Sequence, residues 1–218
     1  MLHILDRQNS LLNNFIAQLR DREIQRDSMR FRRNIERVGE LTAMEISREL
    51  NYRPVTVETP LGRAEVMTIS DTVVLATILR AGLPFHQGLL NYFDDAENAF
   101  VSAYRKSAPD GGFAIKVEYI SCGSLEGKTL ILADPMLATG SSLVCAYEAL
   151  CAKGGQPVHT HFASVLASRQ GVDYVLNHTD AGRVSLWCAT VDGELNERKY
   201  IVPGLGDAGD LAFGEKIG

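Results

Sequence analysis

Residues 129–142 read TLILADPMLATGSS, and this stretch decides the class of fold. The segment from Thr129 to Ala133 is a continuous apolar run, which is typical of a strand buried on both faces. Asp134 ends the run, a short loop follows, and Thr139-Gly140-Ser141-Ser142 then opens an apolar segment that reaches Lys153. A strand, a loop and a helix in this order predict a unit of an α/β protein.

The loop after this strand has the residue types of a phosphate-binding site. In an open parallel sheet, ligands bind beyond the carboxyl ends of the strands, where Asp134 must lie. A helix N-terminus holds a phosphate well, Thr139, Ser141 and Ser142 add hydroxyl donors, and Gly140 lets the backbone approach closely. An ionised Asp134 can accept hydrogen bonds from vicinal hydroxyls such as those of ribose. Taken alone, the stretch fits equally well a structural role, with Asp134 in a turn and a serine as helix N-cap.

The rest of the chain alternates expected strands and helices. Further strands are expected at residues 73–79, 99–104, 158–166 and 184–189, and helices at 83–92, 141–153 and 170–177. Continuous apolar strands with helices between them favour a mostly parallel sheet that helices cover on both faces. The expected fold class is therefore α/β, in one domain that spans residues 1–218.

An arginine-rich arm precedes this core. Between Leu11 and Leu50, apolar residues recur at intervals of three and four, which predicts two amphipathic helices and makes residues 1–50 an N-terminal helical extension. The arginines from Arg20 to Arg37 are interleaved with acidic residues, so a solvated face with ion pairs is favoured. A role facing a phosphate or another subunit stays open for some of them.

Two β-rich segments lie outside the alternation. Residues 55–58 and 64–69 are joined by Pro60-Leu61-Gly62, which predicts a hairpin. Residues 106–128 contain Pro109-Asp110-Gly111-Gly112 and a strand-like run at 115–120. Because long excursions near a site often close over it, this segment is a candidate β-rich hood or lid.

The composition is that of an ordinary globular protein. With 218 residues, of which 45% are hydrophobic, the chain can bury one sizeable core. The formal net charge of -5 is the opposite of that of a protein with a nucleic-acid-binding surface all round. No uncharged apolar run approaches the roughly 20 residues of a membrane helix, and the first residues lack a signal-peptide pattern. The four cysteines form no C-x-x-C pair, which favours reduced thiols and a cytoplasmic location.

Two glycine-containing motifs imitate nucleotide-binding signatures. Residues 204–209 spell G-x-G-x-x-G, but too few residues follow for the strand-helix-strand unit of the dinucleotide fingerprint. Gly127-Lys128-Thr129 imitates the end of a P-loop, but Cys122 stands where that motif begins with glycine, and a strand follows instead of a helix. Neither motif is assigned to nucleotide binding.

Three stretches, in the same order along the chain, resemble type I phosphoribosyltransferases and in particular the uracil phosphoribosyltransferases. Residues 129–142 resemble the motif that binds 5-phosphoribosyl 1-diphosphate (PRPP), with Pro135 where most of that superfamily has a second acidic residue. The runs ILRAGL at residues 78–83 and YIVPGLGDAGD at residues 200–210 agree with the uracil-specific form. The resemblance covers essentially the whole chain and implies the type I phosphoribosyltransferase fold.

The resemblance also implies roles for individual residues. The catalytic residues would be Arg80, Arg105, Asp134 and Asp207, and the two planar, permanently charged guanidiniums suit the diphosphate of PRPP. PRPP would be bound by Arg80, Arg105, Asp134, Pro135, Met136, Leu137, Ala138, Thr139, Gly140, Ser141, Ser142 and Asp207. Uracil would be bound by Ile201, Gly206, Asp207 and Ala208, largely through main-chain groups that match its N–H between two carbonyls.

The implied activity is that of a pentosyltransferase in pyrimidine salvage. Uracil and PRPP would give uridine monophosphate (UMP) and diphosphate, with Mg²⁺ held mainly through PRPP oxygens and no protein ligand assigned to the metal. The partners implied are these substrates and further copies of the chain, as a homodimer or higher homo-oligomer. No membrane and no nucleic acid are expected.

Two other functions stay open at this stage. Some phosphoribosyltransferase relatives are RNA-binding regulators of pyrimidine genes, and the arginine-rich arm is the feature that favours this, although its mixed charges predict little binding. A transferase for another base would share every PRPP-binding residue and would differ only between Tyr200 and Asp210, where the match favours uracil.

Overall fold

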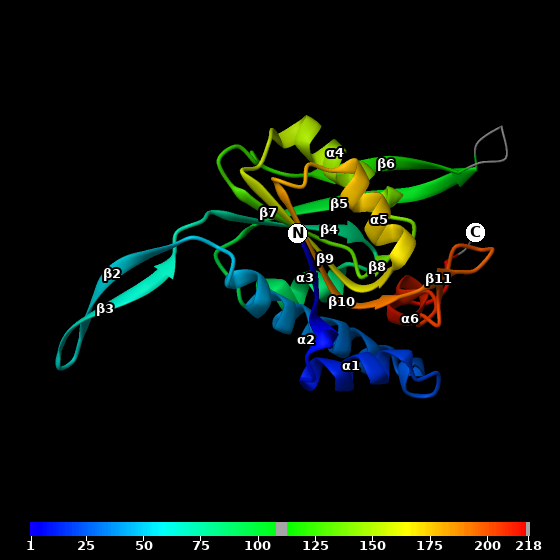
Figure 1. The fold of residues 1–218 in the computed structure, drawn as a ribbon, viewed down its shortest axis with the longest axis horizontal. Helices are drawn as coiled ribbons and strands as arrows, with labels where there is room; N and C mark the ends of the chain where they lie inside the picture. The colour runs from blue at the N-terminus through cyan, green and yellow to red at the C-terminus, as the bar shows by residue number, and fades with distance from the viewer. Residues whose placement is uncertain (108–112, 217–218) are drawn as a thin grey trace.

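A mostly parallel sheet forms the centre of the molecule (Figure 1). The structure, a computed structural model, describes residues 1–107 and 113–216, and the side chains of residues 103–116 lie outside this description. The strands follow the order β1 (Leu2–Ile4), β10 (Val184–Asp192), β9 (His159–Ser168), β7 (Thr129–Ala133), β4 (Val73–Leu79), β5 (Glu97–Ser107) and β6 (Phe113–Ser121). Neighbouring strands are parallel except β5 and β6, and the short β8 (Met136–Leu137) also pairs with β9.

Helices cover both faces of the sheet, which confirms the predicted fold class. The helices α4 (Ser141–Gly154) and α5 (Arg169–His178) lie on one face, and α1 (Leu11–Arg20), α2 (Ser28–Ser47) and α3 (Leu83–Leu90) lie on the other (Figure 1). Strand β7 shows why its sequence is apolar throughout: Ile131 and Ala133 pack with α2 and α3, whereas Leu130 and Leu132 pack with α4 and α5. Successive strand residues point to opposite faces, so a sheet covered twice needs a continuous apolar run.

The first residues of the chain differ from the expectation. Leu2–Ile4 form β1, which pairs in parallel with Leu186–Cys188 of β10, and the short 3-10 helix η1 (Leu5–Arg7) leads on to α1. A strand of only three residues is too short to show the alternation of apolar and polar residues that predicts a strand. Its conformation is therefore determined by pairing with β10 rather than by its local sequence. The arm therefore begins as an edge strand of the sheet. Its two predicted helices, α1 and α2, follow, and the 3-10 helix η2 (Ile24–Arg26) lies between these two helices.

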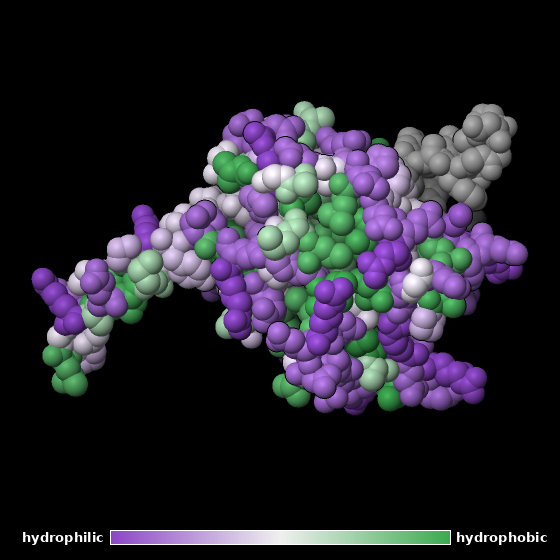
Figure 2. Space-filling view, in the orientation of Figure 1, coloured by the Kyte–Doolittle hydropathy of each residue, from purple (hydrophilic) through white to green (hydrophobic). Residues whose placement is uncertain are grey.

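The predicted hairpin extends beyond its expected limits and projects from the body. It consists of β2 (Tyr52–Thr59) and β3 (Gly62–Ile69), paired in register from Tyr52 with Ile69 to Thr59 with Gly62. Figure 1 shows this arm reaching away from the sheet at the left, and Figure 2 shows hydrophobic residues along it and at its tip. Its exposed apolar side chains are Val57, Leu61, Val66, Met67 and Ile69.

The segment from residue 106 to residue 128 extends the sheet. The predicted strand at 115–120 is β6, which pairs antiparallel with β5 and forms the edge of the sheet. The predicted turn residues Pro109, Asp110, Gly111 and Gly112 lie outside the described residues.

The C-terminal part returns across the end of the sheet. After β10 come β11 (Glu194–Leu195) and β12 (Ile201–Val202), which pair antiparallel, and then α6 (Ala208–Phe213). The G-x-G-x-x-G sequence thus leads into one short helix, which confirms that it is not a dinucleotide fingerprint. Within the part of the chain that the structure describes, no helix is long and apolar enough to cross a membrane.

Candidate active site

The order of the strands determines where a ligand would bind. From β4 the chain passes to β5 on one side, whereas β7 lies on the other side of β4. In an open parallel sheet, such a reversal leaves a crevice at the carboxyl ends of the two strands. Arg80 follows β4 and Asp134 follows β7, so the two residues flank this crevice.

The three stretches that carry the family resemblance contribute residues to one apolar cluster. Ala81, Met136 and Ala138 are partly buried against the same apolar cluster that contains Leu205 and Ala208. Segments that are far apart in the sequence therefore pack against one apolar cluster.

The phosphate loop, residues 134–142, is fixed by its neighbour β9. The Asp134 N–H donates to the Ala163 carbonyl (3.0 Å), and the Ser164 hydroxyl donates to the Asp134 carbonyl (2.7 Å). Farther along, the Ser168 hydroxyl donates to the Ala138 carbonyl. Strand β9 is buried along most of its length, so these bonds tie the loop to the core of the sheet.

The phosphate loop ends at the N-terminus of α4. Gly140 has φ +82°, and a Cβ there would lie 2.9 Å from the Gly171 carbonyl oxygen, so only glycine fits. The Thr139 and Ser141 hydroxyls are 2.9 Å apart, next to the first helical N–H groups, which have no carbonyl within the helix to bind. A small pocket here is lined by Asp134, Met136, Leu137, Ala138, Thr139, Gly140, Ser142 and Leu143. Pro135 is buried behind it, and its carbonyl accepts from the Leu166 N–H.

Arg80 points toward the C-terminal segment. Its Nη2 donates to Asp210 Oδ1 (3.0 Å), and both Nη atoms donate to the Gly214 carbonyl. Asp207 caps α6, because its Oδ1 accepts from the Asp210 N–H (3.0 Å). Asp210, in the first turn of α6, is therefore an ion-pair partner of Arg80, a contact that the sequence pattern did not indicate. Arg105 lies in β5 opposite Ile115 of β6, and its side chain is outside the described residues.

The C-terminal loop, residues 201–208, begins with β12 and ends at the first residue of α6. Ile201 and Ala208 are buried at its two ends, and Gly206 has φ +97°. Its middle residue, Gly204, contacts an ion pair between Arg20 and Asp192, two residues that sequence reasoning did not assign to the site.

A larger pocket lies at the opposite ends of the strands. It has a volume of about 310 Å³ and is lined by Glu49, Leu50, Asn51, Asp71, Thr129, Val158, His159 and His161. Burial lowers the pKa of His161 to about 3, and its Nδ1 accepts a hydrogen bond from Trp187 Nε1 (3.0 Å). This histidine is therefore a neutral packing residue.

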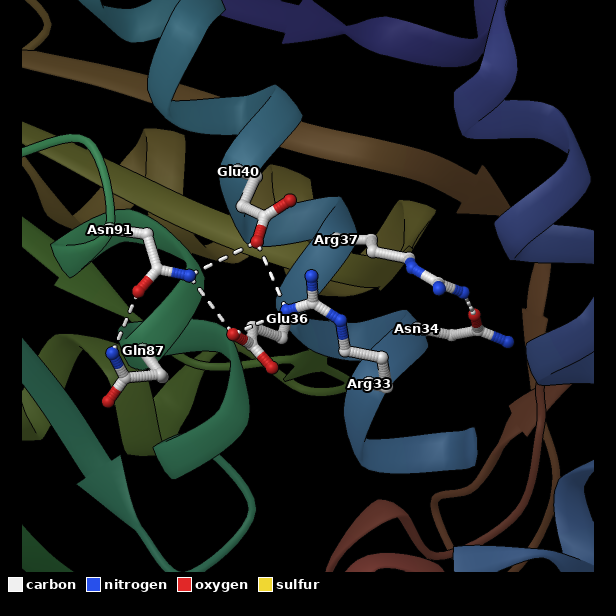
Figure 3. A network of polar contacts seen from close by, with 7 residues as sticks. All are labelled: Arg33, Asn34, Glu36, Arg37, Glu40, Gln87 and Asn91. Carbon is white, nitrogen blue, oxygen red and sulfur yellow. Dashed lines mark hydrogen bonds and ion pairs between the residues drawn. The ribbon is translucent and has the colours of Figure 1, made fainter. Parts of the chain in front are cut away.

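Arginines of the N-terminal arm are largely paired. Arg26 contacts Glu23, and Arg33 contacts Glu36 (2.6 Å) and Glu40 (3.2 Å). Figure 3 shows how this second group joins α2 to Asn91 and Gln87, at the end of α3. These contacts confirm the predicted ion-paired face for these arginines.

Comparison with known proteins agrees with this architecture over nearly the whole chain. A sequence model of the uracil phosphoribosyltransferase family matches residues 6–215. A uracil phosphoribosyltransferase of Porphyromonas gingivalis is 56% identical over 98% of each chain, and one of Methanothermobacter thermautotrophicus is 40% identical over 98% of this chain and 95% of its own. The solved structure of the AQ2163 protein from Aquifex aeolicus is 25% identical and superposes with a TM-score of 0.86 over 98% of each chain. The chain belongs to the uracil phosphoribosyltransferase family.

Proposed function

We propose that the chain catalyses the reaction of its family at the carboxyl edge of the sheet. Uracil N1 bonds to C1 of the ribose of PRPP, the bond from C1 to the diphosphate oxygen breaks, and N1 loses its proton, which gives UMP and diphosphate. The proposal is supported by the strand order, by the contact of Arg80 with Asp210, and by the packing of the phosphate loop and the C-terminal loop against one apolar cluster.

The phosphate loop is proposed to hold the ribose 5-phosphate. Its N–H groups at the start of α4 and the hydroxyls of Thr139, Ser141 and Ser142 supply donors for a dianion. Asp134 then lies at the strand end where the ribose hydroxyls would be, and its carboxylate can also stabilise the positive charge that develops on the ribose. Arg80 and Arg105 would receive the departing diphosphate, and Asp207 would face PRPP near the ribose.

The C-terminal loop is proposed to bind uracil by its main chain. Ile201, Gly206 and Ala208 present backbone N–H and carbonyl groups around the loop, which can match one donor between two acceptors. Cytosine reverses the hydrogen-bonding pattern at two of these positions, so its binding would leave buried groups unpaired.

Magnesium is proposed to arrive with PRPP. Among the described residues, no three His, Cys, Asp or Glu side chains gather as a metal site, and Pro135 occupies the position after Asp134. The oxygens at this site belong to the Asp134 carboxylate and nearby hydroxyls, which suit an ion that keeps most ligands from substrate and water. When bound, the ion would neutralise charge on the leaving diphosphate.

Self-association is proposed through the projecting hairpin. Leu61 at its tip is fully exposed (101%), and Met67 is 59% exposed, although isolated two-stranded hairpins are marginally stable in water. A second copy of the chain would cover these side chains, as a homodimer or higher homo-oligomer. The chain is also proposed to work in a reducing, cytoplasmic compartment, since its four cysteines are free.

The test of the activity is product formation from purified protein with Mg²⁺, PRPP and one of four bases. UMP from uracil, with no product from cytosine, hypoxanthine or orotate, is the expected result. Asp134→Asn and Arg105→Ala should each remove most of this activity. Turnover of another base would contradict the proposal for the C-terminal loop, and PRPP binding without any product would contradict the enzymatic function.

A further inference from the structure

An ion pair from the N-terminal arm holds the C-terminal loop. Arg20, the last residue of α1, meets Asp192, the last residue of β10, through two bonds: Nη1 to Oδ2 at 2.8 Å and Nη2 to Oδ1 at 2.7 Å. Arg20 Nη1 also donates to the Gly204 carbonyl (3.1 Å), and the Gly204 N–H donates to Asp192 Oδ2 (2.9 Å). Both polar backbone groups of Gly204 are thus bound to one ion pair.

Gly204 is the tightest point of the loop. It has φ +61°, and a Cβ there would stand 2.0 Å from the Ile201 carbonyl oxygen, so the chain turns sharply against β12. Gly206 lies two residues farther on. A shift of Gly204 would therefore move the backbone groups on both sides of it.

The ion pair is shielded and stays charged. The Asp192 side chain is 9% exposed and that of Arg20 is 24% exposed. Burial raises the pKa of Asp192, but the Arg20 guanidinium and the Gly204 N–H lower it more, so the pKa of this carboxyl ends below its usual value. A bidentate pair between a planar guanidinium and a carboxylate also fixes orientation.

We propose that Arg20, acting through Asp192 and Gly204, is a positioning residue for the uracil-binding main chain of residues 201–208. The inference rests on the proposed function of this loop. A site made of backbone groups has no side-chain rotamers with which to adjust, so its affinity and its selectivity depend on where the loop is held, within about 0.5 Å. The phosphate loop is held by bonds to β9 instead.

The test measures kcat and both KM values for wild type, Arg20→Ala, Arg20→Lys and Asp192→Asn. We expect Arg20→Ala and Asp192→Asn to raise KM for uracil about tenfold and to leave KM for PRPP within about twofold, because each change leaves a shielded partner unpaired. Arg20→Lys keeps the charge but loses the fork, so an intermediate KM for uracil is expected.

Arg33→Ala is the matched control. It removes an arginine of the same arm from a network between α2 and α3 that does not contact the C-terminal loop (Figure 3). KM for uracil should stay at the wild-type value in this variant, even where the melting temperature falls.

Two results would overturn the inference. One is an equal rise of both KM values in Arg20→Ala, and the other is an unchanged KM for uracil with only a lower melting temperature. Arg20→Lys decides the matter if Arg20→Ala does not fold, since a wild-type KM for uracil in the lysine variant would equally exclude positioning. Failure of the wild type to convert uracil is a separate outcome, because it contradicts the proposed function before any variant is compared.

Discussion

The two loops of the proposed site are held by different kinds of contact. The phosphate loop is bonded to β9, the strand beside it in the sheet, through Ser164 and Ser168. The C-terminal loop is bonded to Arg20 and Asp192, which lie 184 and 12 residues before Gly204 in the chain. One loop is therefore an extension of the sheet, whereas the other is supported by side chains from separate elements.

This difference has a consequence for the two substrates. A loop that continues a buried strand keeps its shape as long as the sheet is folded, which suits the binding of a phosphate by fixed N–H groups. A loop whose middle residue is held by side chains of separate elements can shift without unfolding the sheet. Changes to the phosphate loop should therefore affect PRPP and the chemical step, and changes around Gly204 should affect uracil.

The largest effect is expected for Asp134→Asn. The substitution removes the carboxylate charge beside the proposed ribose site and keeps the size of the side chain, so kcat should fall about 1000-fold, equivalent to about 4 kcal/mol. The measurement is UMP formation at saturating uracil and PRPP. Asp173→Asn, at an exposed position of α5, is the control and should keep full activity. A loss of tenfold or less in Asp134→Asn would mean that the carboxylate only shapes the turn.

The phosphate loop could be predicted from the sequence because its parts are contiguous. An apolar strand, Asp134, a glycine and hydroxyl residues within a short stretch give the strand, the loop and the helix, and the strand from Thr129 to Ala133 has the predicted limits. The supports of the C-terminal loop could not be predicted in this way. Arg20 lies 172 residues from Asp192, and local pattern favoured a solvated face for its segment. The short strand β1 and the contact of Arg80 with Asp210 could not be predicted for the same reason, because each joins segments that are far apart in the sequence.

The next largest effect is expected for Gly204→Ala, which should lower the free energy of unfolding by about 3 kcal/mol. Alanine is strained at φ +61°, and its Cβ would collide with the Ile201 carbonyl at 2.0 Å. Gly206→Ala is the matched comparison, because φ there is +97° but the nearest atom, Leu211 Cδ1, is 3.9 Å away, so a loss of about 1 kcal/mol is expected. Urea unfolding can be followed through Trp187, which is the chain's one tryptophan and is buried. Equal losses in the two variants would show that the loop can move away from β12.

His161, near the amino ends of the strands, allows a change in the stability of the whole fold to be distinguished from a change in the position of the loops. Burial, together with His159 and His3, lowers the pKa of His161 to about 3, below about 6.5 in the unfolded chain. Below pH 6.5 His161 binds a proton in the unfolded state but stays neutral in the folded state. Its contribution to the free energy of unfolding is therefore fully present above this pH and is lost as the pH falls toward 3. At pH 5 the loss should be about 2 kcal/mol relative to pH 8.

His161→Gln is the comparison for this pH effect. It keeps an acceptor for Trp187 but does not titrate, so its unfolding free energy should fall by about 2 kcal/mol less than that of the wild type between pH 8 and pH 5. Other titrating groups contribute to both proteins and cancel in the difference. Parallel pH curves for the two proteins would mean that His161 is protonated in the folded state. The ratio of the two KM values at neutral pH should be unchanged, because the histidine contacts neither loop.

The smallest effect should come from Ser168→Ala, and it completes the comparison. The Ser168 hydroxyl donates to the Ala138 carbonyl and accepts from the Gly171 N–H (2.9 Å), so its loss frees the middle of the phosphate loop at one point while the bonds of Asp134 to β9 remain. KM for PRPP should rise about fivefold, equivalent to about 1 kcal/mol, and KM for uracil should stay within about twofold. Ser185 is a buried serine bonded to His159 near the amino ends of the strands, and Ser185→Ala should change neither value.

The two variants together decide whether the loops are coupled. If Ser168→Ala and Arg20→Ala each raise the KM of a different substrate, the two loops are positioned independently. If both variants raise both KM values, the loops move together and form a single coupled site.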